Sequence, residues 1–166
     1  MALIDALLPE FDREMGVTRR VLERVPDGQF DFKPHPTSVT LGRLAEHLTE
    51  MPLWATTTMT QKELEASEQR PADYRPPQTR AEVLAQFDGC LKTARAALVH
   101  KTDAEFNAPW TLKNHGKEIF TAPKATVMRN FVMNHMIHHR AQLLVYFRML
   151  GVPVPSVYGP SGDEQM

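Results

Sequence analysis

Three histidines in two short segments are the residues whose types and spacing point to chemistry. His135 and His139 stand four positions apart, a spacing that places two imidazoles about one turn apart on the same face of a helix. His47 lies in a second segment of helical character. Neutral imidazole is the commonest protein ligand of zinc-type ions. The pattern therefore suggests a metal site shared by two helices.

The four-residue spacing alone is weak evidence, because seven histidines in 166 residues give about 0.3 such pairs by random placement. Orientation adds more. On a helical wheel, His135 and His139 flank the centre of the apolar stripe of their helix, whereas His138 falls about 80° away. Two inward imidazoles without partners cost free energy that a bound ion offsets. The competing interpretation is that an inward histidine such as His47 is a hydrogen-bonded core residue.

The expected number of protein ligands distinguishes a catalytic metal site from a structural one. Three imidazoles from two helices leave coordination positions open, as in catalytic zinc sites, whereas structural zinc sites are closed by four ligands. Side chains on or near the same face, and so candidates to surround the ligands, are Asn134, Gln142 and Tyr146. The sequence assigns no general base. The lone Cys90 is interpreted as a core thiol.

The elements that must position these residues are four long segments of helical period separated by proline-rich breaks. They cover about residues 3–25, 41–59, 80–100 and 123–150. Before the last of them, a turn-forming cluster at residues 113–117 stands between two short apolar runs and predicts a small hairpin. Helices with mostly short connections predict an all-α fold, an up-down four-helix bundle. The length of 166 residues suits a single domain, residues 1–166.

Composition excludes several classes of protein. Lys and Arg number 19 and Asp and Glu 20, a formal charge of −1, which argues against a nucleic-acid partner because phosphate binding needs clustered basic residues. One cysteine excludes an internal disulfide and suits a reducing compartment. We see neither a signal peptide nor an apolar run long enough to span a membrane. We therefore expect a cytoplasmic protein without a membrane partner.

Three segments together resemble the DinB family, also called DinB/YfiT-like: TLGRLAEH at 40–47, NHMIHHRAQ at 134–142 and GVPVPSVYGP at 151–160. The resemblance covers nearly the whole chain. It implies a four-helix bundle, commonly dimeric, with a divalent metal ion held by three histidines that fall on His47, His135 and His139. One departure is Ala141, where the family often has glycine. The family includes thiol-dependent S-transferases, in which the metal activates a low-molecular-weight thiol.

The expected function is that of a divalent-metal-dependent enzyme, S-transferase-like, that binds Zn²⁺ or Ni²⁺ and activates a thiol or water toward a small-molecule substrate. Two alternatives stay open. One is a metal-dependent hydrolase that uses water as the nucleophile. The other is a non-catalytic dimeric bundle that the metal only stabilises. An open coordination position favours catalysis, and a fourth protein ligand favours a structural role.

A second apolar face on the last helix bears on association. Ile137 and Leu144 fall opposite the main stripe of that helix, among arginines that include Arg140. This pattern predicts a homodimer formed through a symmetric patch. The alternative is a monomer in which the tail, residues 151–160, folds back over these side chains.

Overall fold

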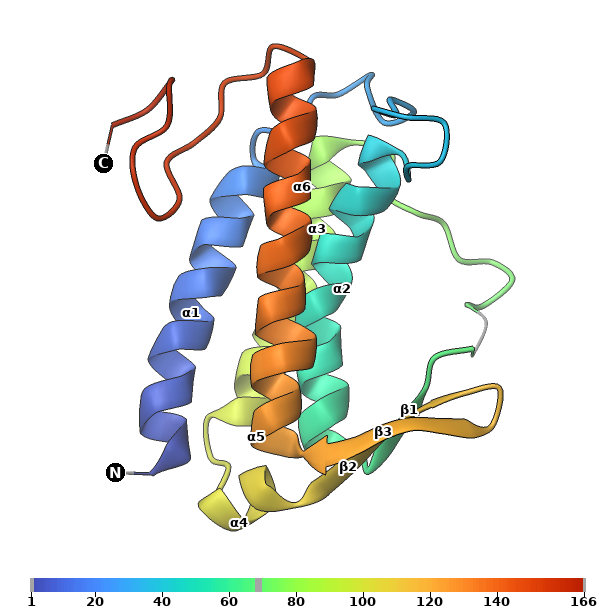
Figure 1. Ribbon diagram of the computed structural model, residues 1–166, viewed down its shortest axis with the longest axis vertical. Helices are drawn as coiled ribbons and strands as arrows, with labels where there is room; N and C mark the ends of the chain where they lie inside the picture. The colour runs from blue at the N-terminus through green and yellow to red at the C-terminus, as the bar shows by residue number, and fades with distance from the viewer. Residues whose placement is uncertain (1, 68–69, 166) are drawn as a thin grey trace.

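The protein, described by a computed structural model over residues 2–67 and 70–165, is mostly helical with a small sheet at one end (Figure 1). The long helices are α1 (Leu3–Leu22), α2 (Leu41–Thr60), α3 (Arg80–Leu98) and a continuous segment of α5 (Lys124–Val127), η1 (Met128–Asn134) and α6 (His135–Met149). The remaining elements are α4 (Asp103–Asn107), β1 (Glu63–Glu65), β2 (Pro109–Asn114) and β3 (Lys117–Pro123). The helices expected from the sequence are all present.

The directions of the long helices differ from the up-down alternation that the sequence led us to expect. In Figure 1, α1 and α6 run upward, whereas α2 and α3 both run downward. The start of α3 lies beside the end of α1, where the backbone N–H of Arg80 donates to Asp27. The cause is the connection between α2 and α3. Its residues 61–79, at about 3.3 Å each, can return along a 20-residue helix of about 30 Å, so α3 can run in the same direction as α2.

Helix starts follow the local signals in the sequence. Thr40 caps α2 by accepting a hydrogen bond from the backbone N–H of Arg43. Thr79 and Glu82 form the reciprocal capping box at the start of α3, which satisfies two otherwise unpaired N–H groups. Both caps matter for the site because they define where α2 and α3 begin.

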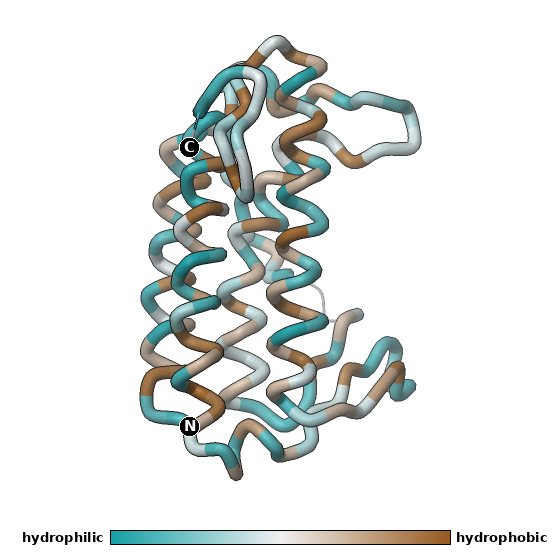
Figure 2. The backbone as a smooth tube through the Cα atoms, turned by 60° about the vertical axis from the view of Figure 1, so that its left-hand side comes forward, coloured by the Kyte–Doolittle hydropathy of each residue, from teal (hydrophilic) through white to brown (hydrophobic). Residues whose placement is uncertain are grey.

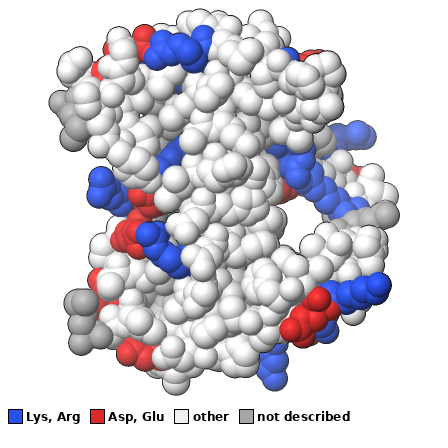
Figure 3. All heavy atoms as spheres, viewed as in Figure 1, with Lys and Arg blue, Asp and Glu red and all other residues white. Residues whose placement is uncertain are grey.

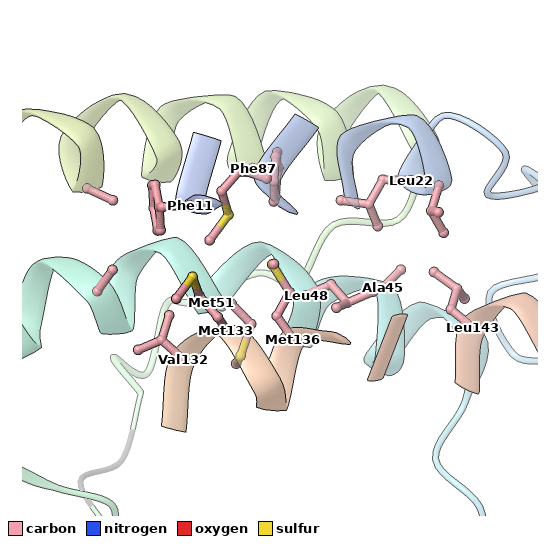
Figure 4. Close-up of a cluster of buried hydrophobic side chains, with 14 of the residues drawn as sticks. Phe11, Leu22, Ala45, Leu48, Met51, Phe87, Val132, Met133, Met136 and Leu143 are labelled. Atoms are coloured by element: carbon pink, nitrogen blue, oxygen red, sulfur yellow. The ribbon is translucent and has the colours of Figure 1, made fainter. Parts of the chain in front are cut away.

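The core lies between the long helices. Figure 2 shows hydrophobic and hydrophilic positions alternating along each helix, as amphipathic helices require. Side chains from every long helix meet in the interior, and Figure 4 shows several of them in close-up. Those with no exposed surface include Phe11, Met51, Phe87 and Met136.

The predicted hairpin is present and is joined by a strand that the sequence did not indicate. β2 and β3 pair antiparallel, and the turn between them places His115 and Gly116 at positive φ. β1 adds to β2 in parallel. It is three residues long and polar, and the carboxylate of Glu65 at its end accepts the backbone N–H groups of His115 and Gly116. So short a polar strand has no periodic signal of its own.

The tail folds back on its own chain and contacts α6 and α1. The hydroxyl of Tyr158 lies 2.6 Å from the guanidinium of Arg140, and Glu164 pairs with Arg20. The homodimer stays a prediction. The exposed apolar side chains that α6 offers to such an interface are Val145 and Met149. Among the described residues, no helix is both long and apolar enough to cross a bilayer.

Candidate metal centre

His47 on α2 and His135 and His139 on α6 converge between the two helices. The Nε2 atoms of His47 and His135 lie 3.4 Å apart, and those of His135 and His139 lie 2.7 Å apart. Among the described residues, the group of side chains that can hold one ion consists of these three, with donor atoms all within 4.8 Å of one another. Each ring is partly buried. The structure thus brings together the three histidines that the sequence selected.

The outer edge of each ring has a partner. The Nδ1–H of His47 donates to Glu50 Oε2 at 3.0 Å, and that of His139 donates to Gln142 Oε1 at 2.7 Å. The backbone of Phe131, one turn before His135, acts on that ring in the direction that raises its pKa. A neutral imidazole carries a single N–H. His47 and His139 therefore each turn an Nε2 lone pair toward the centre of the cluster, the arrangement that metal-ligating histidines adopt.

The donor set fits a divalent ion. Without an ion, the 2.7 Å contact between the Nε2 atoms of His135 and His139 is a hydrogen bond that requires a proton on one of them. A cation bound between the rings would take the place of that proton. Neighbouring ligand atoms in a tetrahedral zinc site lie about 3.3 Å apart, given Zn–N bonds of about 2.0–2.1 Å. The separation of His47 and His135 matches that spacing, whereas the Nε2 atoms of His135 and His139 lie closer together.

Burial keeps His135 and His139 in the protonation state that a metal needs. Burial and the neighbouring His139 and His47 together lower the pKa of His135 to about 4. Burial also lowers the pKa of His139, although the hydrogen bond with Gln142 opposes the change. Both rings are neutral at pH 7, so no proton has to leave them before they bind an ion.

A network of ion pairs supports His47 from outside. Glu50 contacts Arg43 at 3.4 Å and also pairs with Arg70. Burial opposes ionisation of Glu50, but the hydrogen bond from His47 and the charges of both arginines hold its pKa below the usual range. The buried Glu46 pairs with the same two arginines. Sequence reasoning missed these carboxylates, although an acidic residue three positions after a ligand histidine on a helix was a usable signal.

Aromatic side chains cover the side of the cluster toward the sheet. The ring of Trp54 lies edge-on to His47 at 5.5 Å and tilted to His135 at 5.2 Å. It stacks on Phe131 with 4.7 Å between ring centroids. Phe131 belongs to η1, a π-helical stretch that the sequence did not predict. Such stretches are common at functional sites, and this one directly precedes His135.

Comparison with known proteins bears on this geometry. Residues 2–165 match the sequence model of the DinB family. The chain belongs to the DinB family. It is 25% identical to the uncharacterized protein YrdA of Bacillus subtilis strain 168 over 161 residues, which cover 97% of this chain and 91% of YrdA.

Solved structures of DinB-like proteins share the fold of this DinB-family chain. A protein from Bacillus cereus ATCC 10987 superposes with a TM-score of 0.69 at 23% identity, covering 93% of this chain and 97% of that one. YjoA from Bacillus subtilis gives 0.65 at 18% identity, with 99% of both chains covered. At these identities the likeness shows the fold, and the site must be argued from the residues of this chain.

The side chains expected around the ligands make different contacts in this DinB-family chain. Gln142 takes the expected place on His139. Asn134 instead bonds to Asn130 at 3.3 Å, and the hydroxyl of Tyr146 donates to the backbone carbonyl of Val39 at 3.1 Å. His138 is exposed and accepts a hydrogen bond from Gln142 at 3.1 Å, outside the three-atom cluster.

Acidification is expected to destabilise the metal-free protein. An unfolded histidine has a pKa of about 6.5, whereas that of folded His135 is about 4. Between pH 4 and pH 6.5, His135 is protonated in the unfolded chain but neutral in the folded chain. The free energy of unfolding is therefore highest above about pH 6.5 and decreases as the pH falls toward 4. The loss is at most about 3 kcal/mol.

Urea unfolding of the metal-free protein at pH 7 and pH 4.5 measures this loss. The control is His135→Gln, which cannot titrate. Its stability should depend less on pH than that of the unchanged protein, and an equal pH dependence in the two proteins would contradict the assignment to His135.

Proposed function

We propose that this DinB-family protein is a divalent-metal-dependent enzyme of the S-transferase type. The observation that carries the proposal is the convergence of three Nε2 atoms with no fourth protein ligand beside them among the described residues. A set of three leaves room for a reactant, as in catalytic zinc sites. Zn²⁺ and Ni²⁺ both suit imidazole ligands. When bound, such an ion supplies Lewis acidity, which lowers the pKa of a thiol or water.

The residues of the chain supply positioning and access. Glu50 and Gln142 hold the rings of His47 and His139 in the required tautomer, which removes the need to reorganise them when a reactant arrives. Trp54 shields the cluster on one side. On another side a hollow of about 200 Å³ opens onto His47 and His139, so a small reactant has a path to the site.

A second, larger hollow favours transfer between two molecules over hydrolysis of one. This groove of about 510 Å³ adjoins the first at Arg43, and its lining includes Glu50, Leu53, Trp54 and Phe131. Figure 3 shows the molecule hollowed on its right-hand side, beside α2 and the connection that follows it, with basic side chains along the upper edge. The smaller hollow suits the thiol, and the groove suits the molecule that receives it.

Metal analysis followed by an activity screen tests the proposal. We expect about one divalent ion per chain after metal supplementation, and metal-dependent thioether formation between a low-molecular-weight thiol and 1-chloro-2,4-dinitrobenzene. The chelator-treated protein, before and after metal is restored, is the control. Less than a tenth of an equivalent of metal would refute the site. Full occupancy with ester hydrolysis but no thiol transfer would favour the hydrolase, and full occupancy without turnover would favour the structural role.

A further inference from the structure

The hollow that opens onto the histidine cluster is small and has one charged wall. It holds about 200 Å³ and is lined by Val39, Arg43, Leu44, His47 and His139. Pockets for drug-sized molecules usually run from about 300 to 1,000 Å³, so this one suits a molecule with only a few atoms beyond the reacting one. Val39 and Leu44 offer it an apolar wall. Arg43 is the charged group in the described lining.

The charges around the cluster leave room for a ligand with two negative charges. Glu46 and Glu50 pair with Arg43 and Arg70, and these four charges sum to zero. An imidazole that ligates a metal ion carries no charge of its own, whereas a divalent ion adds two positive charges. In a partly buried site such an excess is felt more strongly than in water. A thiolate neutralises one charge, and a second acidic group on the same molecule neutralises the other.

Arg43 has the geometry to receive that second group. Its hydrogen bonds to Glu46 and Glu50, at 3.2 and 3.4 Å, both use Nη1. Among the described residues the edge formed by Nε and Nη2 is thus left for another acceptor, and 43% of the side chain is exposed. A guanidinium edge binds a carboxylate through two parallel hydrogen bonds. Arg70 bonds to the same two carboxylates but lines the larger groove instead.

We propose that Arg43 binds the carboxylate of the thiol substrate, so that the substrate is a small thiol acid whose sulfur reaches the histidine cluster while its carboxylate is held at the wall of the hollow. This inference rests on the proposed function and adds the substrate class to it. Arg43 is a specificity-determining residue in this arrangement, because binding at the carboxylate orients the sulfur.

Two thiols of the same skeleton test the proposal. The protein is loaded with Co²⁺ and titrated with 3-mercaptopropionate and with 3-mercaptopropionamide, and sulfur-to-cobalt charge-transfer absorption reports binding without any turnover. The unchanged protein should bind the acid at least about tenfold more tightly than the amide, the size expected of a charge-assisted hydrogen bond. Arg43→Gln should abolish that preference, which is a ratio of two affinities measured in the same variant. Arg43→Lys, which keeps the charge, should retain part of it.

Arg70→Gln is the matched control, since it removes the same charge from the same two carboxylates but not from the hollow. It should keep the preference for the acid. Three results would overturn the role of Arg43: no preference in the unchanged protein, a preference that survives Arg43→Gln, or an equal loss in Arg70→Gln. In each of them binding of the amide still supports the proposed function. If neither thiol changes the cobalt spectrum, the proposed function and the inference both fail.

Discussion

Replacement of His139 by alanine is expected to lower the affinity of the protein for Zn²⁺ by more than about 100-fold. Loss of an outer hydrogen bond to a ligand already costs about 10- to 100-fold in metal affinity, and loss of the ligand itself must cost more. His47→Ala and His135→Ala should behave alike, because each removes one of the three converging Nε2 atoms. Competition with a chromogenic chelator measures these affinities.

His138 provides the matched control for this prediction. It is adjacent to His139, its ring lies 4.9 Å from that of His139, and it shares Gln142 as a hydrogen-bond partner. Its Nε2 nevertheless bonds outward to that amide. His138→Ala should therefore leave the affinity within a few fold. A loss as large as that in His139→Ala would show that the ligand set has been assigned wrongly.

The ligand histidines were predictable because their placement depends on local geometry. His135 and His139 both lie in α6, where a four-residue step returns to the same face whatever precedes the helix. The π-helical η1 changes the rotation of the residues before His135 relative to a wheel drawn at 100° per residue. The pair survives that change because neither member lies within η1. The helix caps and the proline-rich breaks between helices likewise predicted the bounds of each long helix to within a few residues.

The support around the ligands was not predictable in the same way. Arg70 reaches Glu46 and Glu50 only because the connection after α2 runs back along the helices, and that connection has no hydrophobic period from which its path follows. The parallel direction of α2 and α3 has the same origin. Contacts that depend on how a long irregular segment crosses the surface are set by tertiary structure, which spacing along the chain does not encode.

Arg140 shows the same limit on the opposite face of α6. The sequence grouped it with other arginines on a face that the tail or a second subunit would cover, but it did not indicate the partners among which Arg140 is buried, with 1% exposed. Its guanidinium lies 2.8 Å from the carboxylate of Glu14 and 3.1 Å from the hydroxyl of Thr18. Tyr158 from the tail donates to the same carboxylate at 2.8 Å. Because this buried charge is so well paired, removal of its counter-ion should have a large effect on the stability of the fold.

Glu14→Gln is expected to lower the free energy of unfolding by about 3 kcal/mol. The change keeps the shape of the side chain but leaves the positive charge of Arg140 buried without its counter-ion, and an uncompensated buried charge costs about 3–5 kcal/mol. The pair formed by Glu10 and Arg129 joins the same two helical segments at 2.8 Å, but with side chains 39% and 47% exposed. Glu10→Gln makes the same chemical change there and should cost no more than about 0.5 kcal/mol.

Urea unfolding of the two variants at one pH and in the same metal state measures both losses. Similar losses would contradict the reasoning, because they would mean that burial does not control the value of the ion pair. A second variant identifies the cause. If the loss in Glu14→Gln comes from the orphaned charge, adding Arg140→Met removes that charge and should make the double variant more stable than Glu14→Gln alone. A further loss on adding Arg140→Met would instead assign the stabilisation to the contacts of Arg140 with Thr18 and Tyr158.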